Sequence, residues 1–379
     1  MSNEREILPR AVPVTLVRKG RGAVSNIAHR FESVERQVDA EAFEAARVHA
    51  DEIGSEDPAL PALATTTTLE TARSLITYNE SPDIGFDRSI NPYRGCEHGC
   101  IYCFARPSHS YLNLSPGVDF ETKLVAKHNA VELLVKELAA PKYRAKVIAV
   151  GVITDAYQPI ERDLRITRGV VDVLAHARHP FSLITKSSLI ERDIDLLAPL
   201  AIDGLVAATI SITTLDHALS RILEPRAASP QRRLRTVMTL AAAGIPVTVN
   251  VAPIIPFINE PEIEQVLEAA SHAGARQAHY TVLRLPWEVS PLFVQWLEAH
   301  FPDRAGRVMN RVREMRGGKN YDSRFGVRMT GEGTWAALIR QRFAKAATRL
   351  RLDREIPPLR EDLFVAPQPN NPPPQLDLF

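Results

Sequence analysis

The sequence predicts an α/β protein built on a mainly parallel sheet, and three observations point to it. Six short apolar runs follow one another between residues 74 and 285, and amphipathic helical patterns separate most of them. The runs are nearly continuous in aliphatic residues, as expected of strands that are covered on both faces. Polar residues follow the runs directly, as they do at the carboxyl ends of strands where such proteins carry their sites.

The expected strands, in order, are residues 74–78, 146–154, 181–185, 204–213, 246–255 and 278–285. The expected helices, with apolar residues three and four apart, are residues 129–140, 167–178, 231–244 and 262–274. Right-handed crossovers would wind these units into a full or partial α/β barrel, or into an open doubly wound sheet. Each of these folds gathers the strand ends at one mouth.

The composition is that of a soluble globular protein. The chain has 379 residues, of which 45% are hydrophobic and 24% charged. No apolar run approaches the roughly 18 residues that a membrane span needs. The first ten residues, MSNEREILPR, are charged and do not form a secretory signal. We therefore expect a cytoplasmic protein without a membrane partner.

Four regions are expected along the chain: an N-terminal extension (1–72), the strand–helix repeat (73–300), a basic helical region (301–354) and a Pro-rich tail (355–379). Between Arg304 and Arg354, fourteen Lys or Arg residues face four acids, an excess of ten. This excess indicates either a solvated helix face or a surface for a polyanion. The tail is expected to be a disordered, semi-extended tether that does not pack.

The most informative stretch is NPYRGCEHGCIYCFARPSH, residues 91–109. It holds all the cysteines of the chain, Cys96, Cys100 and Cys103. In a reducing compartment, clustered cysteines more often bind metal or do redox chemistry than form disulfides, and an odd number leaves one unpaired. Three thiolates on an iron–sulfur cluster would leave one iron open to a small molecule. The alternative is a structural zinc site, for which the histidines near enough in sequence are His98, His109 and His128.

Tyr102, directly before the last cysteine, completes the pattern C-x3-C-x-aromatic-C. This pattern resembles the signature of the radical S-adenosylmethionine (SAM) superfamily, and the branch that contains spore photoproduct lyase is the most similar. The resemblance covers about residues 70–290 and includes the stretches SPDIGFDRSINPYRGCEHGCIYCFAR, TDAYQPIE, LEPRAASPQRRL and VAPIIPFIN. It implies a partial (β/α)6 barrel, similar to a TIM barrel, with the cluster loop after the first strand.

The resemblance also implies cofactors and roles. The three cysteines would bind three irons of a [4Fe–4S] cluster, and SAM would chelate the fourth iron. The implied SAM contacts are Tyr102 near the adenine, Thr154 and Asp155 near the amino group, Lys186 at the carboxylate, and Ser211 at the carboxylate or ribose. A fixed ammonium beside a carboxylate ligand is physically favourable, which agrees with the role of Lys186. An electron donor such as flavodoxin or ferredoxin would be a partner.

The chain departs from the lyase pattern in one respect. That family uses an additional cysteine to return a hydrogen atom to the product radical, and this chain has only the three cysteines of the motif. The final hydrogen would have to come from recycled 5′-deoxyadenosine or from a tyrosine such as Tyr157 or Tyr280. The lyase reaction itself is therefore not expected to transfer.

The last five residues, QLDLF, resemble the peptide with which bacterial replication and repair proteins bind the DNA sliding clamp. Leu376, Leu378 and Phe379 would be apolar anchors on an extended tether, and Gln375 would supply an orienting amide. The stretch REDLF, residues 360–364, is a weaker echo without the glutamine. The alternative is a terminus that folds back on its own domain.

Three functions remain open on the sequence. The first is a radical SAM enzyme that acts on DNA or nucleotides in a repair-related reaction, which the cysteine motif, the basic region and the tail favour. The second is a radical SAM enzyme that modifies RNA, a protein or a metabolite. The third is an iron–sulfur or zinc protein that senses or scaffolds without catalysis, against which the polar strand ends argue.

Overall fold

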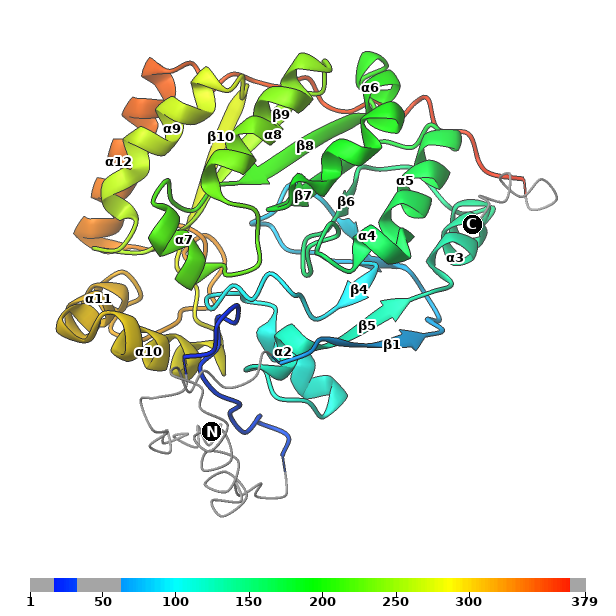
Figure 1. Cartoon of the computed structure of the whole chain (residues 1–379). Helices are drawn as coiled ribbons and strands as arrows, with labels where there is room; N and C mark the ends of the chain where they lie inside the picture. Colours follow the sequence, from blue (N-terminus) through cyan, green and yellow to red (C-terminus); the bar gives the residue numbers. More distant parts are fainter. Residues whose placement is uncertain (1–16, 33–62, 369–379) are drawn as a thin grey trace, which may run out of the picture.

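The centre of the molecule is a seven-stranded sheet with helices on its outer side (Figure 1). The computed structural model describes residues 17–32 and 63–368. The strand order is β10-β9-β8-β7-β6-β3-β2. The strands are β2 (Ile76–Tyr78), β3 (Arg88–Ile90), β6 (Ile148–Val150), β7 (Phe181–Thr185), β8 (Val206–Ser211), β9 (Val247–Ile254) and β10 (Gln277–Val282). All neighbouring pairs are parallel except β2 with β3.

The sheet confirms the predicted α/β fold and decides between its variants. Strands β10 and β2 are the two edges and do not pair with each other in the described chain, so the sheet is a partial barrel and not a closed one. Residues 181–185 form β7 as expected, and the other long apolar runs contain β6, β8, β9 and β10. The aliphatic residues of these strands are buried against the helices that follow them.

The first strand differs from its prediction. Residues 74–78 were expected to open the parallel sheet, but Ile76–Tyr78 is β2, an antiparallel edge strand. The strand that pairs in parallel with β6 and leads to the cysteines is β3, in which Ile90 lies opposite Val150. Only three residues long, β3 begins with Arg88, which is buried because Asp87 and the carbonyl of residue 144 accept its hydrogen bonds. An apolar pattern cannot reveal such a strand.

Five helices cover the outside of the parallel strands: α3 (Ala130–Leu138), α5 (Ile166–His176), α6 (Ile194–Ile202), α8 (Pro230–Ala242) and α9 (Ile263–His272). Four of them were predicted, with ends that differ by at most two residues. Helix α8 begins at Pro230, because Ser229 Oγ accepts a hydrogen bond from the N–H of Arg232 and Pro230 occupies the first turn. The helices bury one apolar face each, with Leu134, Leu174, Leu197, Leu240 and Leu267 fully covered.

Shorter elements complete the mouth of the barrel. A second sheet joins β1 (Thr66–Glu70), β5 (Lys123–Lys127) and β4 (Tyr93–Arg94). The short helices are α2 (Asp119–Thr122), α4 (Glu161–Leu164) and α7 (His217–Leu223), with the 3-10 turns η1 (Arg106–Leu112), η2 (Ser188–Asp193) and η3 (Glu260–Glu262). Except for β1, which precedes the main sheet in the sequence, these elements lie in the connections that follow its strands, as the cysteines do.

The basic region packs on the barrel. After α10 (Val289–His300) come α11 (Pro302–Glu314) and α12 (Gly333–Arg349). Helix α12 buries Ile339 and Phe343 against α9 and β10. The N–H of Ala278 in β10 donates to the carbonyl of Leu352 at 2.9 Å, so the chain after α12 covers the edge strand. The helices of this region therefore have an apolar face as well as a basic one.

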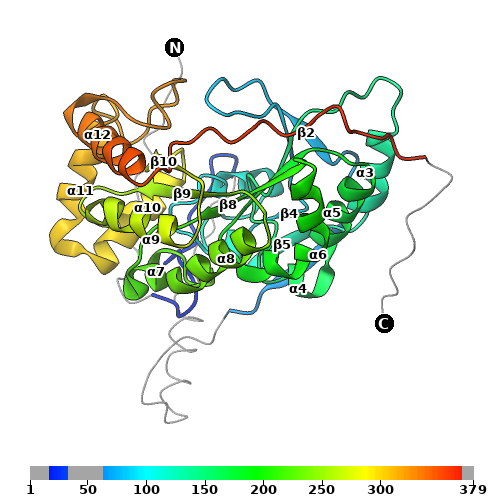
Figure 2. The same cartoon turned by 90° about the horizontal axis from the view of Figure 1, so that it is seen from above.

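Both ends of the described chain lie on the barrel as irregular segments. Residues 17–32, which we call the N-terminal strap, cross the cysteine loop. Residues 357–368, the C-terminal strap, run along the outside toward α3 and α5 (Figure 2). The expectation that the chain after residue 355 does not pack is wrong for the C-terminal strap, because Leu363 and Phe364 are apolar anchors on the helical layer. REDLF is thus bound to its own chain, whereas QLDLF lies outside the described residues. None of the described helices is long and apolar enough to span a membrane.

Candidate active site

The three cysteines lie on one loop between β4 and η1. Cys96 and Cys100 are buried, and Cys103 is partly exposed. Burial raises the pKa of the Cys100 thiol to about 12 and that of Cys96 well above its usual value, and the neighbouring thiols contribute to both shifts. Three clustered thiolates in such a place need a compensating positive charge. The donor set therefore fits a cationic iron–sulfur cluster with three thiolate ligands.

The histidines expected for a zinc site are bound elsewhere. His98 Nδ1 lies 3.2 Å from Asp155 Oδ2, and His109 Nε2 lies 2.9 Å from the carbonyl of residue 123. His128 Nε2 lies 2.8 Å from Thr71 Oγ1. Among residues 17–32 and 63–368, no three His, Cys, Asp or Glu side chains are arranged to hold a single metal ion. Each of the three histidine rings thus has another polar partner.

A buried ion pair holds the backbone of the cysteine loop. Arg106 donates to the carbonyls of Gly99 at 3.1 Å and Cys100 at 2.9 Å, and to Glu121 Oε1 at 2.5 Å. Glu121 also accepts hydrogen bonds from the backbone N–H groups of residues 22–23, at 3.0 and 2.8 Å. Both side chains of the pair are fully buried. The loop is thus fixed by a charge network that includes the N-terminal strap.

Gly99 and Gly22 make this contact sterically feasible. Gly99 has a φ of +68°, a conformation that glycine adopts readily, and a Cβ there would lie 2.8 Å from Glu121 Oε2. A Cβ on Gly22 would lie 1.9 Å from the carbonyl oxygen of Gly99. The strap and the loop therefore approach so closely that neither position has room for a side chain.

Asp155 lies in the loop after β6 and connects this loop and the end of β7 to the cysteine loop. Its carboxylate accepts hydrogen bonds from Thr185 Oγ1 at 2.6 Å and from the N–H of Lys186 at 2.8 Å, and it faces His98. Burial alone would raise the pKa of Asp155, but His98 and these hydrogen bonds lower it to about 2. The carboxylate is therefore ionised. Thr154 Oγ1 similarly donates to the carbonyl of Tyr93 at 2.7 Å.

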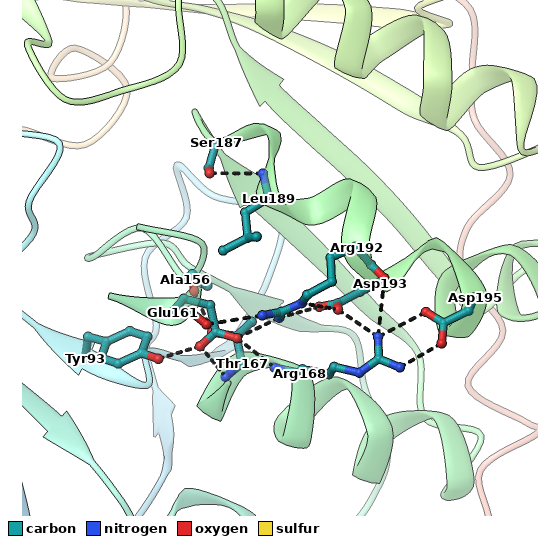
Figure 3. Close-up of polar contacts among 10 residues, drawn as sticks. All are labelled: Tyr93, Ala156, Glu161, Thr167, Arg168, Ser187, Leu189, Arg192, Asp193 and Asp195. Atoms are coloured by element: carbon teal, nitrogen blue, oxygen red, sulfur yellow. Dashed lines mark hydrogen bonds and ion pairs between the residues drawn. The ribbon is translucent and has the colours of Figure 1, made fainter. Parts of the chain in front are cut away.

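A second network of hydrogen bonds and ion pairs, centred on Glu161, fixes the loop after β6 (Figure 3). Glu161 accepts hydrogen bonds from the hydroxyl of Tyr93, from the N–H of Thr167 at 2.8 Å and from Arg192 Nη2 at 2.7 Å. Arg192 Nε donates to Asp193 at 2.7 Å. Because Tyr93 lies in β4, directly before the cysteines, this network joins the cysteine loop to the ends of β6 and β7.

Tyr102 is held by a carboxylate that the sequence analysis did not single out. Its hydroxyl donates to Glu224, which also accepts from Thr213 Oγ1 at 2.5 Å and pairs with Arg233. Burial would raise the pKa of Glu224, but Arg233 and Lys186 lower it to about 2. Arg233 Nη1 donates to the carbonyl of Ser211 at 3.0 Å. The aromatic residue of the motif and the end of β8 are thus joined through one buried ion pair.

Lys186 completes this group. Its Nζ lies 5.9 Å from the centre of the Tyr102 ring. Burial alone would lower the pKa of Lys186, but the nearby Cys100 and Glu224 raise it overall. The lysine is therefore a fixed cation between the end of β7 and the cysteine loop. A carboxylate-bearing ligand placed beside the cysteines would meet this cation.

The structure brings most of the predicted site residues together. Those gathered around the cysteine loop are Cys96, Cys100, Cys103, Tyr102, Thr154, Asp155, Lys186 and Ser211. Tyr157 is fully buried near Asp193, whose charge adds to burial in raising the pKa of the tyrosine. Tyr280 packs against Phe343 of α12, with ring centres 4.7 Å apart, and so belongs to the helical layer and not to the cysteine group.

Four further residues support the site and had no role assigned from the sequence: Arg106, Glu121, Glu224 and Arg233. Glu224 and Arg233 lie in LEPRAASPQRRL, a stretch that was noticed only through its resemblance. A buried carboxylate and a buried arginine look like surface residues in a single sequence. Their pairing appears only when the loops are placed in space.

Comparisons with known proteins agree with this site. A family model of the radical SAM superfamily matches residues 90–270. The chain is 35% identical over 232 residues to an uncharacterized protein of Mycobacterium tuberculosis, which covers 61% of this chain and 67% of the relative. It is 27% identical to an uncharacterized protein of Methanocaldococcus jannaschii over 223 aligned residues. The aligned region covers 59% of this chain and 80% of the relative.

Among solved structures, the fold is similar to that of spore photoproduct lyase. One variant of that lyase superposes with a TM-score of 0.53 and 13% sequence identity, covering 85% of each chain. The lyase complexed with dinucleoside spore photoproduct gives a TM-score of 0.52 and 14% identity, covering 75% of this chain and 79% of the lyase chain. At this level of identity, the likeness shows a shared fold.

Proposed function

Because this chain is an enzyme of the radical SAM superfamily, we propose that it holds a [4Fe–4S] cluster and acts on DNA or a nucleotide. The ligands are Cys96, Cys100 and Cys103. One observation carries the cluster assignment: a single loop gathers three free thiols, two of them buried. One iron is then left for SAM, as in the logic of an open metal site.

A bound and reduced cluster would supply the electron for reductive cleavage of SAM, and so the radical chemistry that removes a hydrogen atom from the substrate. The residues of the chain bind and orient. Lys186 is suited to the methionyl carboxylate, because it is a cation whose Nζ lies 5.9 Å from the centre of the Tyr102 ring. Tyr102 offers a ring face for the adenine, with its hydroxyl anchored to Glu224. Ser211 lies at the adjoining strand end, with its carbonyl bound to Arg233.

Asp155 acts as a positioning residue in this proposal. Its four hydrogen-bonding and ionic contacts come from Thr185, from the N–H groups of Tyr157 and Lys186, and from His98. The carboxylate therefore fixes the backbone of Lys186 relative to the cysteine loop. Thr154 fixes the neighbouring carbonyl of Tyr93.

A nucleic acid substrate is supported by two features of the chain. The region from residue 304 to residue 354 has ten more basic than acidic residues, and the chain ends in a clamp-like peptide. The final hydrogen atom cannot come from a fourth cysteine, because the chain has three. Tyr157, or 5′-deoxyadenosine returning to the radical form, is the proposed source.

The test is reconstitution with iron and sulfide without oxygen, followed by reduction and measurement of 5′-deoxyadenosine. We expect four irons per chain, and 5′-deoxyadenosine that increases when intact or irradiated DNA is added. Cys100→Ala should lose the cluster and the product. Zinc-only protein without SAM cleavage would end the proposal, and stimulation by RNA or by no nucleic acid would move the substrate to another class.

We also propose that QLDLF binds the DNA sliding clamp. The C-terminal strap is fixed on the helical layer by the hydrogen bond from the N–H of Val365 to the carbonyl of Ala177, 2.8 Å long. The tail therefore starts from the side of the barrel and not from its mouth. Deleting residues 375–379 should abolish binding to purified clamp without lowering SAM cleavage; unchanged clamp binding would refute this role. A flavodoxin or ferredoxin is the proposed electron donor.

A further inference from the structure

Three large aromatic side chains stand exposed around one arginine. We call this cluster the aromatic platform: Arg30, Phe31, Tyr111 and Trp287. The guanidinium carbon of Arg30 lies 4.6 Å from the ring centre of Phe31, 5.3 Å from that of Tyr111 and 4.5 Å from that of Trp287. The three aromatic residues are 52%, 70% and 65% exposed, respectively. Exposed aromatic groups of this size usually mark a binding surface.

The platform is rigid because the buried carboxylate of Glu288 holds its arginine in place. Arg30 Nη1 lies 2.8 Å from Glu288 Oε2, and the N–H of Arg30 donates to Glu288 Oε1 at 3.1 Å. Glu288 is almost fully buried. Trp287 has a φ of +45°, a backbone conformation that residues other than glycine rarely adopt. Such conformations persist where the surrounding structure imposes them, and they cluster at ligand sites.

The platform lies at the mouth that holds the cysteines. Tyr111 is in η1, which follows the cysteine loop, and Trp287 follows β10 at the far edge of the sheet. The N-terminal strap bridges these two sides: the N–H of Ile27 donates to Ser115 Oγ at 3.1 Å, and Ser25 Oγ donates to Gln295 Oε1 at 2.7 Å. The strap passes beside α10 and α2 (Figure 1). It therefore carries Arg30 and Phe31 to the open side of the partial barrel.

A second pair lies next to the cysteines. Phe104, directly after Cys103, is 41% exposed, and the guanidinium carbon of Arg284 lies 5.1 Å from its ring centre. Arg284 has weak contacts with Met329 Sδ and the Tyr321 hydroxyl, at 3.4 and 3.5 Å, and no carboxylate partner within the part of the chain that the structure describes. Its Nε is buried without a hydrogen-bond partner. An unpaired guanidinium beside exposed rings is complementary to a ligand that has both an aromatic face and a negative charge.

We infer that the aromatic platform stacks with unpaired bases of a single-stranded nucleic acid segment and that Arg284 receives one of its phosphates. The inference rests on the proposed function and names the substrate as an unpaired strand. Aromatic side chains stack with every base, and each stacked base contributes about 1–3 kcal/mol. Bases inside a duplex are covered by their neighbours, so the platform selects a single strand or an extruded nucleotide.

The test measures affinity for fluorescently labelled single-stranded DNA, single-stranded RNA and duplex DNA by anisotropy, using the reconstituted full chain. We expect either single strand to bind at least tenfold more tightly than the duplex. Trp287→Ala and Tyr111→Ala should each weaken single-strand binding about tenfold. Arg284→Gln should lower the salt dependence of binding by about one phosphate contact. Melting curves and iron content establish that each variant is folded.

Tyr78→Ala is the matched control. Tyr78 is 61% exposed, and the guanidinium carbon of Arg88 lies 5.3 Å from its ring centre. It lies opposite Arg88 at the start of β3, so it belongs to the other end of the barrel. This variant should bind the single strand as the unchanged protein does.

Two results would overturn the inference. One is equal single-strand affinity of the Trp287, Tyr111 and Tyr78 variants, and the other is preference for the duplex. If DNA still stimulates SAM cleavage in either case, the proposed function stands and only the platform is wrong. Conversely, platform-dependent binding without any SAM cleavage would retain the surface and remove the proposed function.

Discussion

The two straps of this chain are bound to the barrel by different forces. The N-terminal strap is held by buried charge, since Glu121 accepts hydrogen bonds from the N–H groups of residues 22–23 and pairs with Arg106. The C-terminal strap is held by two backbone hydrogen bonds, 2.9 and 2.8 Å long, and by the ring of Phe364 on the helical layer. Both segments lack regular secondary structure, so their anchors decide their order.

Of the two straps, only the N-terminal strap is part of the site. A buried charge network has strict geometry, and the loss of one member leaves an uncompensated charge. Because Arg106 also holds the carbonyls of Gly99 and Cys100, the N-terminal strap and the cysteine loop form one unit. Aromatic packing on the outside is more tolerant and lies away from the cysteines. The C-terminal strap therefore attaches the tail to the outside of the barrel and is not part of the site.

The largest effect is expected for Glu121→Gln. The substitution leaves the Arg106 guanidinium buried without its countercharge, which costs about 3–5 kcal/mol. The midpoint of urea unfolding, followed by circular dichroism, should fall, and iron content after reconstitution should fall with it.

Glu191→Gln is the matched control for this variant. Glu191 pairs with Arg232 through two contacts of 2.6 and 2.8 Å, but both side chains are partly exposed. A pair of this kind contributes about 0.2–1 kcal/mol. Equal losses in the Glu121 and Glu191 variants would contradict the distinction between the two kinds of anchor.

Gly22→Ala should have the next largest effect. The new Cβ would lie 1.9 Å from the carbonyl oxygen of Gly99, so the strap must move away from the cysteine loop. Overpacking of this kind costs about 1–3 kcal/mol. Thermal unfolding should begin earlier, and the reconstituted cluster should bleach faster in air. Gly85→Ala serves as control, because nothing lies within 4 Å of a Cβ at that position.

Phe364→Ala should destabilise less and should leave the site intact. The ring lies 5.6 Å from that of Tyr143 and 5.2 Å from that of His179, between centres, and it is only half-buried. The substitution removes the buried part of the Phe364 ring, and the lost burial should lower the free energy of unfolding by about 1–2 kcal/mol. Limited proteolysis should release the C-terminal strap sooner, with unchanged 5′-deoxyadenosine formation. A parallel loss of SAM cleavage would show that this strap is coupled to the site after all.

Mild acid should have the smallest effect on the free energy of unfolding, and it should act through His179, which contacts Phe364 of the C-terminal strap. Burial lowers the pKa of His179 to about 4, and the nearby Arg88 adds to this shift. The histidine is neutral when folded and takes up a proton on unfolding below about pH 6.5, so acid favours the unfolded state. Between pH 7 and pH 5.5, this linkage should remove about 1 kcal/mol of stability.

The measurement compares urea unfolding at the two pH values in the unchanged chain and in His179→Gln. The variant cannot take up this proton, so its pH dependence should be flatter by the same amount. An unchanged slope would mean that His179 does not titrate between the folded and unfolded states.

Much of the fold could be predicted because its signals are local. Residues 181–185 are read as a strand from their own apolar run, and α8 from the periodicity of its apolar residues. The long parallel strands are buried on both faces, and this leaves a continuous apolar pattern. The apolar run at residues 74–78 does mark the edge strand β2, but it does not show that this strand pairs in antiparallel fashion. The short strand β3 leaves no apolar pattern, because it begins with an arginine.

The three cysteines, the aromatic residue beside them and the polar strand ends could be identified from the sequence alone, because they depend on local spacing and on the order of apolar and polar residues. Tertiary structure alone decided what surrounds them. Glu121 accepts hydrogen bonds from residues 22–23, which are 99 and 98 positions away in the sequence, and Glu224 bonds to Tyr102 across 122 positions. A buried charge is tolerated only when folding brings its countercharge next to it. Because the two residues are far apart in the sequence, no local pattern predicts the pair.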